Sequence, residues 1–316
     1  MVRIDVVAAT KGRSGLLLGC SMAALAAMST QPALALSGEQ VTAGYSSTVS
    51  GGSSANNSAT STSSVDQSMS SSGGVNNSVF GHDYGAVNGF FGTRSSGQGV
   101  YSMSGISEYQ AILTNSLAVA ADFKVTYLLD NGQVNVAAAT TATGNQKAAV
   151  TATLKGTKGT TVTTYLNYVA SLSFDSTTQV TPAFTETGLV LNPAGPTLAP
   201  DSGDYSWNAY TGTVDVGVLA PGDSIALDYT LTSIASGTTP YNNPQLLTAV
   251  YGGGGYGSPP SDGGTGIGRF GDPVTSNNPG GPFSVTVNAV PEPASMAVLG
   301  AGLAGLAFAR RKRAAR

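Results

Sequence analysis

Few residues of this chain are of a type that could carry acid–base, nucleophilic or metal chemistry. Its 316 residues include one His and one Cys, and only 10% are Asp, Glu, Lys or Arg, against roughly a quarter in ordinary soluble domains. One histidine and one cysteine exclude an internal disulfide framework, a multi-histidine metal cage and a multi-cysteine metal site. A Ser-His-Asp triad would have to use His82, but no Gly-x-Ser-x-Gly elbow accompanies it. We interpret His82 as an exposed loop residue and expect no catalytic residues.

Paired carboxylates are the next chemistry to consider, because glycoside hydrolysis needs two of them at a fixed separation. Glu108 and Glu186 are the glutamates that lie away from the two ends of the chain. A surface glycoside hydrolase would require them within about 10 Å of each other. We expect each to be an exposed strand-edge residue, so the hydrolase is the least favoured function.

A third candidate site lies between residues 201 and 207. Asp201 and Asp204 could offer oxygen ligands to calcium, and Tyr205 and Trp207 could stack on sugar rings. The alternatives are that Asp-Ser-Gly is ordinary turn chemistry and that Trp207 fills the core. The second alternative is favoured for the tryptophan. A carbohydrate- or calcium-binding module is therefore kept as the second function, and neither a cofactor nor a metal centre is predicted.

Charge is distributed unevenly along the chain. Residues 36–290 contain six Lys or Arg and fifteen Asp or Glu, a net charge of −9, whereas the other eight basic residues lie at the two ends. An acidic body repels phosphates, which excludes a nucleic-acid-binding function.

The N-terminus has the pattern of a secretory signal peptide over residues 1–35. Basic residues up to Arg13 precede an apolar run, and a small-x-small motif at Ala33 and Ala35 follows, which predicts cleavage after Ala35 by signal peptidase and export through the Sec translocon. A retained anchor and a lipoprotein site at Cys20 are the alternatives. Cleavage after Ala35 would remove Cys20 with the signal.

The C-terminus carries a tripartite pattern over residues 290–316. Pro291, Glu292 and Pro293 precede an uncharged segment, 294–309, which would form a helix about 24 Å long and is predicted to cross the membrane. A basic cluster of Arg310, Arg311, Lys312 and Arg313 follows. Such a cluster stays in the cytoplasm, which places the body on the other side of the membrane. The alternative is a plain C-terminal anchor.

This C-terminal pattern resembles the PEP-CTERM sorting signal of Gram-negative bacteria. Pro291-Glu292-Pro293 matches the signature tripeptide, with the apolar segment and the basic end at the usual spacing. The resemblance implies recognition by exosortase, a membrane enzyme, and a setting in which exopolysaccharide is made. It covers about 27 residues and implies nothing directly about the body.

The body between these signals has two parts. Residues 36–75 form a low-complexity segment rich in Ser, Thr and Gly, which buries too little apolar surface to favour folding. We expect a spacer or loop there, with 40–49 as an alternative first edge strand. The sequence leaves its glycosylation open.

Residues 76–289 alternate between apolar and polar side chains, which predicts β-strands. Examples are 122–129, 225–232 and 283–287. Turn signals separate them: a hairpin is expected at Asp130-Asn131-Gly132 and another turn at 155–159, whereas residues 237–282 are expected to be a Gly/Pro-rich loop. Together these signals predict an all-β fold, an antiparallel β-sandwich of about ten strands.

From the sequence we expect a non-enzymatic protein that passes through the inner membrane to the cell surface or the extracellular matrix. Its expected role is structural or adhesive, in association with exopolysaccharide or biofilm. The matrix component bound, the oligomeric state and the release or attachment of the mature form are not determined by the sequence.

Overall fold

A computed structural model describes residues 36–74, 77–87, 91–138, 144–176, 179–186, 189, 191–238, 264–270 and 283–290, with 301–303, 305 and 310 near the C-terminus. The signal peptide with Ala33 and Ala35, the tripeptide Pro291-Glu292-Pro293, and the tail residues Arg311, Lys312 and Arg313 lie outside the described residues. So does most of 294–309, of which 301–303 and 305 are helical. No helix in the described portion has the length and apolar character needed to traverse a membrane.

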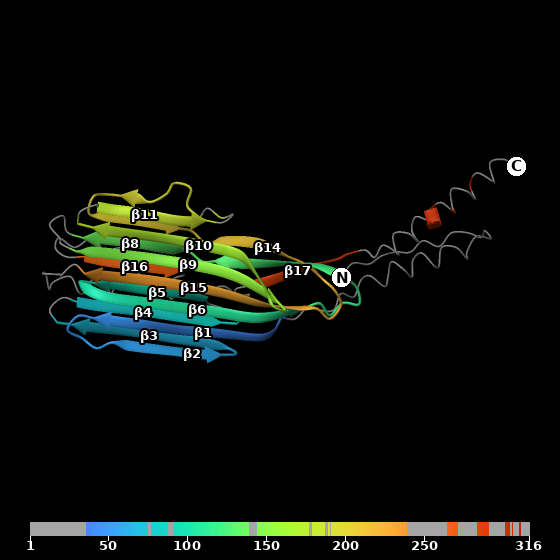
Figure 1. Ribbon diagram of the computed structural model, residues 1–316, viewed down its shortest axis with the longest axis horizontal. Coiled ribbons are helices and arrows are strands. Elements are labelled where there is room, and N and C mark those ends of the chain that lie inside the picture. The colour runs from blue at the N-terminus through green and yellow to red at the C-terminus, as the bar shows by residue number, and fades with distance from the viewer. Residues whose placement is uncertain are drawn as a thin grey trace, which may run out of the picture. The chain divides into compact units, whose positions relative to one another are not determined.

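The described chain forms antiparallel strands in three sheets (Figure 1). Sheet A contains, in spatial order, β11 (Gln179–Glu186), β10 (Thr161–Asp175), β9 (Asn145–Lys158), β15 (Ser224–Thr238), β6 (Val100–Thr114), β1 (Leu36–Val49) and β2 (Ala55–Ser61). Sheet B contains β12 (Thr197–Leu198), β13 (Ser202–Trp207), β8 (Gly132–Ala138), β16 (Gly264–Phe270), β5 (Phe91–Gln98), β4 (Asn77–Ala86) and β3 (Ser64–Gly73). Sheet C contains β14 (Tyr210–Leu219), β7 (Ala121–Leu129) and β17 (Phe283–Ala289).

The predicted all-β, antiparallel, sandwich-like fold is confirmed. Long strands alternate strictly between the two faces of their sheet, because successive side chains of a strand point to opposite sides. In β6, Tyr101, Met103 and Tyr109 are buried, whereas Ser102 and Ser104 are exposed. The described residues hold seventeen strands rather than about ten, since two segments expected to be loops also contribute strands.

The expectation of a spacer at residues 36–75 is wrong, because this segment forms β1, β2 and β3. A strand needs only every second residue to be buried, and here Val41, Ala43 and Val49 supply those positions in β1. The many Ser, Thr and Asn residues face outward, so their abundance does not prevent folding. In the same way β16 interrupts the predicted loop 237–282, and its Phe270 is fully buried.

Sheets A and B approach each other so closely that main chain packs on main chain. A Cβ atom at Gly268 of β16 would lie 2.5 Å from the carbonyl oxygen of Ala149 and 3.0 Å from that of Ile234. Real Cβ atoms essentially never come that close to a backbone oxygen. Glycine is therefore required where β16 crosses β9 and β15.

The hairpin predicted at Asp130-Asn131-Gly132 is wrong. The turn predicted at 155–159 is confirmed in part: β9 and β10 form a hairpin, but its turn is at 159–160 and residues 155–158 belong to β9. The chain passes from β7 in sheet C into β8 in sheet B, and the two strands do not pair with each other. Gly132 serves a packing role instead: a Cβ there would lie 2.1 Å from Cζ2 of Trp207. The indole Nε1 of Trp207 also donates to the carbonyl of Asp130 at 3.2 Å.

Candidate functional site

His82 lies on a strand rather than in an exposed loop, which corrects the expectation for this residue. It belongs to β4, faces outward from sheet B, and is opposite Arg94 of β5 and Ser68 of β3. Its Nε2 lies 2.9 Å from Oδ1 of Asp66, and its ring lies 5.1 Å from that of Tyr84. The imidazole thus contacts a carboxylate on a sheet face.

The register does not bring Glu108 and Glu186 together. Glu108 is on β6 and Glu186 on β11, four strands away in sheet A, a separation of about 19 Å at the usual strand spacing. The neighbour of Glu108 is Asp228 on β15 instead. Burial, and after it the charge of Asp228, raises the pKa of Glu108. A hydrolase built on the two glutamates is therefore not supported.

Residues 201–207 are positioned by β13 and do not form a sugar platform. Tyr205 and Trp207 are 2% and 6% exposed, and the Trp207 ring packs against Tyr168, Tyr205 and Phe270. Their faces are taken up by this core cluster, so neither ring is available to stack on a sugar.

The two aspartates of this segment are engaged with protein groups. Asp204 accepts hydrogen bonds from the side-chain amides of Gln133 and Asn135, and Asp201 accepts one from the hydroxyl of Ser202 at 3.3 Å. Across the described ranges, no three His, Cys, Asp or Glu side chains gather as metal ligands would. The calcium alternative has no support from this geometry.

A buried polar cluster lies between sheets A and B. Asp83 of β4 is fully buried and accepts a hydrogen bond from Thr93 of β5. The Thr93 hydroxyl lies 2.8 Å from that of Ser233 on β15, which in turn lies 2.8 Å from that of Ser95. Burial raises the pKa of Asp83 from 3.8 to about 8, and the Thr93 hydrogen bond opposes this shift only in part. The cluster is closed to solvent and is a feature of the core.

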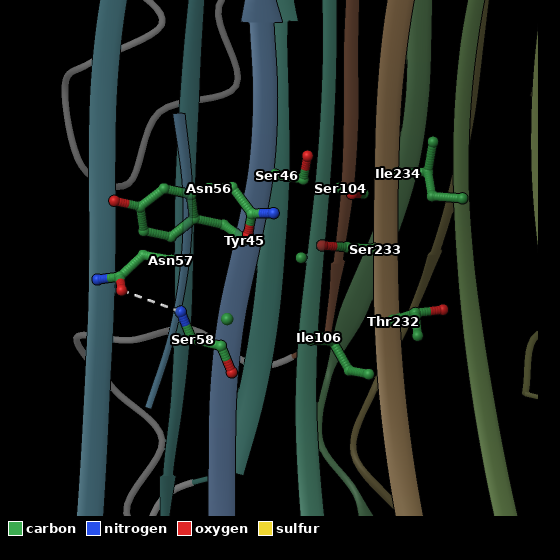
Figure 2. A pocket seen from close by; sticks show the side chains of 12 residues that line it. Tyr45, Ser46, Asn56, Asn57, Ser58, Ser104, Ile106, Thr232, Ser233 and Ile234 are labelled. Atoms are coloured by element: carbon green, nitrogen blue, oxygen red, sulfur yellow. Dashed lines mark hydrogen bonds between the residues drawn. The ribbon is translucent and has the colours of Figure 1, made fainter. Parts of the chain in front are cut away.

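A groove on the outer face of sheet A is the best candidate for a binding site (Figure 2). It crosses β2, β1, β6 and β15 and has a volume of about 400 Å³, within the roughly 300–1,000 Å³ typical of ligand clefts. We call it the sheet A groove. Sequence reasoning missed it, because it depends on which strands are neighbours.

Two rows of side chains border this groove. Ser46, Ser104 and Ile234 lie opposite one another on successive strands, and Gly44, Ile106 and Thr232 form the next row. Figure 2 shows the side chains of Ser46, Ser104, Ile106, Thr232 and Ile234 projecting from the strands. Gly44 has no side chain, which leaves the second row low at its β1 end. Ile106 and Ile234 are 37% and 38% exposed.

The surface of the sheet A groove is mainly apolar and carries a few hydroxyl groups, which suits a neutral ligand that has both apolar faces and hydroxyl groups. Serine and threonine hydroxyls can both donate and accept hydrogen bonds, as sugar hydroxyls do. The exposed isoleucines offer apolar contacts to the less polar faces of such a ligand. None of the lining residues is charged.

Comparison with known families identifies a PEP-CTERM protein-sorting motif at residues 289–313. No curated protein matches the chain. The motif indicates a protein that is exported and sorted to the cell surface through the membrane by exosortase. It begins at Ala289, the last residue of β17.

Proposed function

We propose that this chain, which carries a PEP-CTERM sorting motif, is a structural or adhesive protein of the cell surface or extracellular matrix that associates with exopolysaccharide. It is not an enzyme. The Sec translocon and signal peptidase act at its N-terminus, exosortase acts at its C-terminus, and the inner membrane holds it transiently. The setting is a biofilm-forming Gram-negative bacterium.

The outer face of sheet A is the observation that carries the adhesive part of this proposal. Across the middle strands this face combines exposed isoleucines with hydroxyl side chains, among them Thr42, Ser46, Ser102, Ser104, Thr230, Thr232 and Ser236. The sheet A groove lies within it. A long polymer that meets such a face makes many weak contacts, and linked weak contacts add up to firm attachment.

A retention experiment tests the proposal. The secreted protein is sedimented with the polysaccharide of the host, and its binding to a glycan array is measured. We expect retention by a neutral polysaccharide. Absence of retention by every glycan would contradict the proposed association.

A matched pair of variants locates the contact. Ser104 and Ser102 are both exposed, on the same face of β6, but only Ser104 lines the sheet A groove. Ser104→Tyr should fill the groove and weaken retention, whereas Ser102→Tyr should leave retention unchanged. Equal effects of the two variants would remove the groove from the binding surface.

A further inference from the structure

One lateral border of the sandwich consists of β2 and β3, the last strands of sheets A and B on the same side (Figure 1). We call it the open border. Within the described part of the chain, β2 pairs only with β1 and β3 only with β4. A strand at the end of a sheet leaves half of its main-chain donors and acceptors directed outward, where another strand can bind.

The two strands of the open border are held level with each other. At one end the β1–β2 turn packs on the β3–β4 turn, main chain to main chain: a Cβ at Gly73 would lie 2.4 Å from the carbonyl oxygen of Ser50. Further along, the Asn57 amide of β2 donates to Oε1 of Gln67 of β3 at 2.5 Å. The border therefore presents two strands as one unit.

The opposite border is protected against strand addition, whereas the open border is not. On the opposite side, β11 contains Pro182 and β12 has only two residues. Proline and short strands are two of the devices by which proteins block edge pairing. The seven residues of β2 and the ten of β3 include no Pro, Lys or Arg.

Main-chain groups of the open border are accessible. The N–H of Ser58 donates to its neighbour's side chain, Asn57 Oδ1, at 3.0 Å, so this donor is not used by β1. Asn56, Asn57, Ser58 and Thr60 are exposed. The carbonyl of Asp66 on β3 accepts from the side chain of Gln67 at 2.9 Å. A partner strand can replace these local side-chain contacts.

Charge also favours this border. Residues 36–290 have a net charge of −9, so two copies repel each other over most of their surfaces. The only charged residue in strands β2 and β3 is Asp66, which contacts His82. The open border is therefore a place where two acidic copies can approach at low electrostatic cost.

We infer that the open border binds a second copy of this chain, with β2 pairing antiparallel to β2 of the partner and β3 to β3. A two-fold axis perpendicular to the sheets brings identical strands together in antiparallel orientation and aligns both layers at once. Sheets A and B then continue across the pair. No other partner chemistry is needed, because the border is complementary to itself.

Disulfide trapping tests this inference, because Cys20 is the only cysteine. In the full chain with Cys20→Ser, single cysteines are introduced as Asn56→Cys, Ser58→Cys or Thr60→Cys. The matched controls are Thr181→Cys, Ala183→Cys and Thr185→Cys, exposed positions of β11 on the protected border. Covalent dimer is measured on non-reducing gels after mild oxidation, and the self-association of the Cys20→Ser chain is measured by sedimentation in detergent.

We expect at least one β2 position to give about tenfold more covalent dimer than any β11 position, since a disulfide forms only where two Cα atoms come within about 7 Å. Adding Ser58→Pro to the Asn56→Cys or Thr60→Cys chain removes an outward N–H and should reduce this dimer while leaving the monomer folded. Equal trapping on both borders, or no trapping on β2 with a monomer in sedimentation, would overturn the inference.

Discussion

The backbone N–H of Gly222 donates to the carbonyl oxygen of Asn115 at 2.9 Å, and the N–H of Asn115 donates to the carbonyl of Asp223 at the same distance. Two turns more than 100 residues apart in sequence thus form one corner, where β6, β14 and β15 end or begin. The buried side chain of Asn115 completes it by donating to the carbonyls of Leu219 and Val119 at 2.7 and 3.0 Å. Next to this corner, just before β7 begins, the carbonyl of Ala120 accepts a hydrogen bond from the N–H of Val290 at 3.0 Å. Val290 is the residue that precedes the sorting tripeptide.

Replacing Asn115 by alanine is expected to destabilise the body. The change leaves the buried carbonyl of Leu219 without its donor, at a cost of about 1–3 kcal/mol, and also removes the partly buried hydrogen bond to Val119. Chemical denaturation of the full chain measures the loss in free energy of unfolding.

Asn192→Ala is the matched control, because Asn192 also donates to a main-chain carbonyl, that of Ser206 at 2.7 Å, but in an exposed turn. Water can replace that contact, so the loss should be smaller. A larger loss from Asn192→Ala than from Asn115→Ala would show that the corner is not a stabilising element.

The stability of the body is expected to fall as pH rises from about 4 to about 8. Burial raises the pKa of Asp83 from 3.8 to about 8, so the folded chain keeps a proton that the unfolded chain releases in this window. The stabilisation is complete below pH 4 and is lost as pH approaches 8, with a total change on the order of a few kcal/mol. Denaturant midpoints measured across this range test the slope.

Asp83→Asn should flatten that slope, because the amide keeps the size of the side chain and does not ionise. His82→Gln is the control, since it removes the only histidine and should leave the slope in place. If His82→Gln abolishes the slope and Asp83→Asn does not, Asp83 is not its source.

Introducing a methyl group at Gly268 is expected to separate the two sheets. The Cβ of Gly268→Ala would press on the main-chain oxygens of Ala149 and Ile234, which cannot move without shifting whole strands. We expect a destabilisation of about 3 kcal/mol. Ser104→Ala, at an exposed position of β6, should stay within about 0.5 kcal/mol of wild type, and thermal melting distinguishes the two.

Removal of the sorting tripeptide is expected to stop processing. With Pro291→Ala, Glu292→Ala and Pro293→Ala combined, full-length chain should accumulate in the inner-membrane fraction, because exosortase no longer recognises its signal. Asn288→Ala, an exposed change on β17, should be processed normally. Delivery of the triple variant at wild-type levels, detected by mass spectrometry of the mature termini, would refute this role for the tripeptide.

The fold class followed from periodicity, because a strand such as β7 or β15 records its two faces in alternate residues. The partners of those two strands could not be predicted in this way, since β7 pairs with β14 and β17, and β15 pairs with β6 and β9, all of them far away in the chain. Gly132 illustrates the limit: Asp-Asn-Gly reads as a hairpin turn, but the glycine is there because the Trp207 ring lies against its main chain.

The candidate sites differed in whether the sequence alone could reveal them. The sorting signal could be recognised in the sequence, because a membrane enzyme reads it as a linear segment. The sheet A groove could not, because Ser46, Ser104 and Ile234 become neighbours only through the register of β1, β6 and β15. The sequence favoured the core over a sugar site for Trp207, and the structure places this side chain in the core, where burial stabilises a large ring.

The sequence by itself determined that this is an acidic all-β chain with a C-terminal sorting motif, because composition, alternation and a contiguous motif are local properties. Only the tertiary structure decided that residues 36–74 fold, that an aspartate is enclosed between two sheets, and that, among the described residues, one border of the sandwich is open to strand addition while the other is protected. These features depend on which strands become neighbours, and in an antiparallel sandwich that is set by contacts between distant segments.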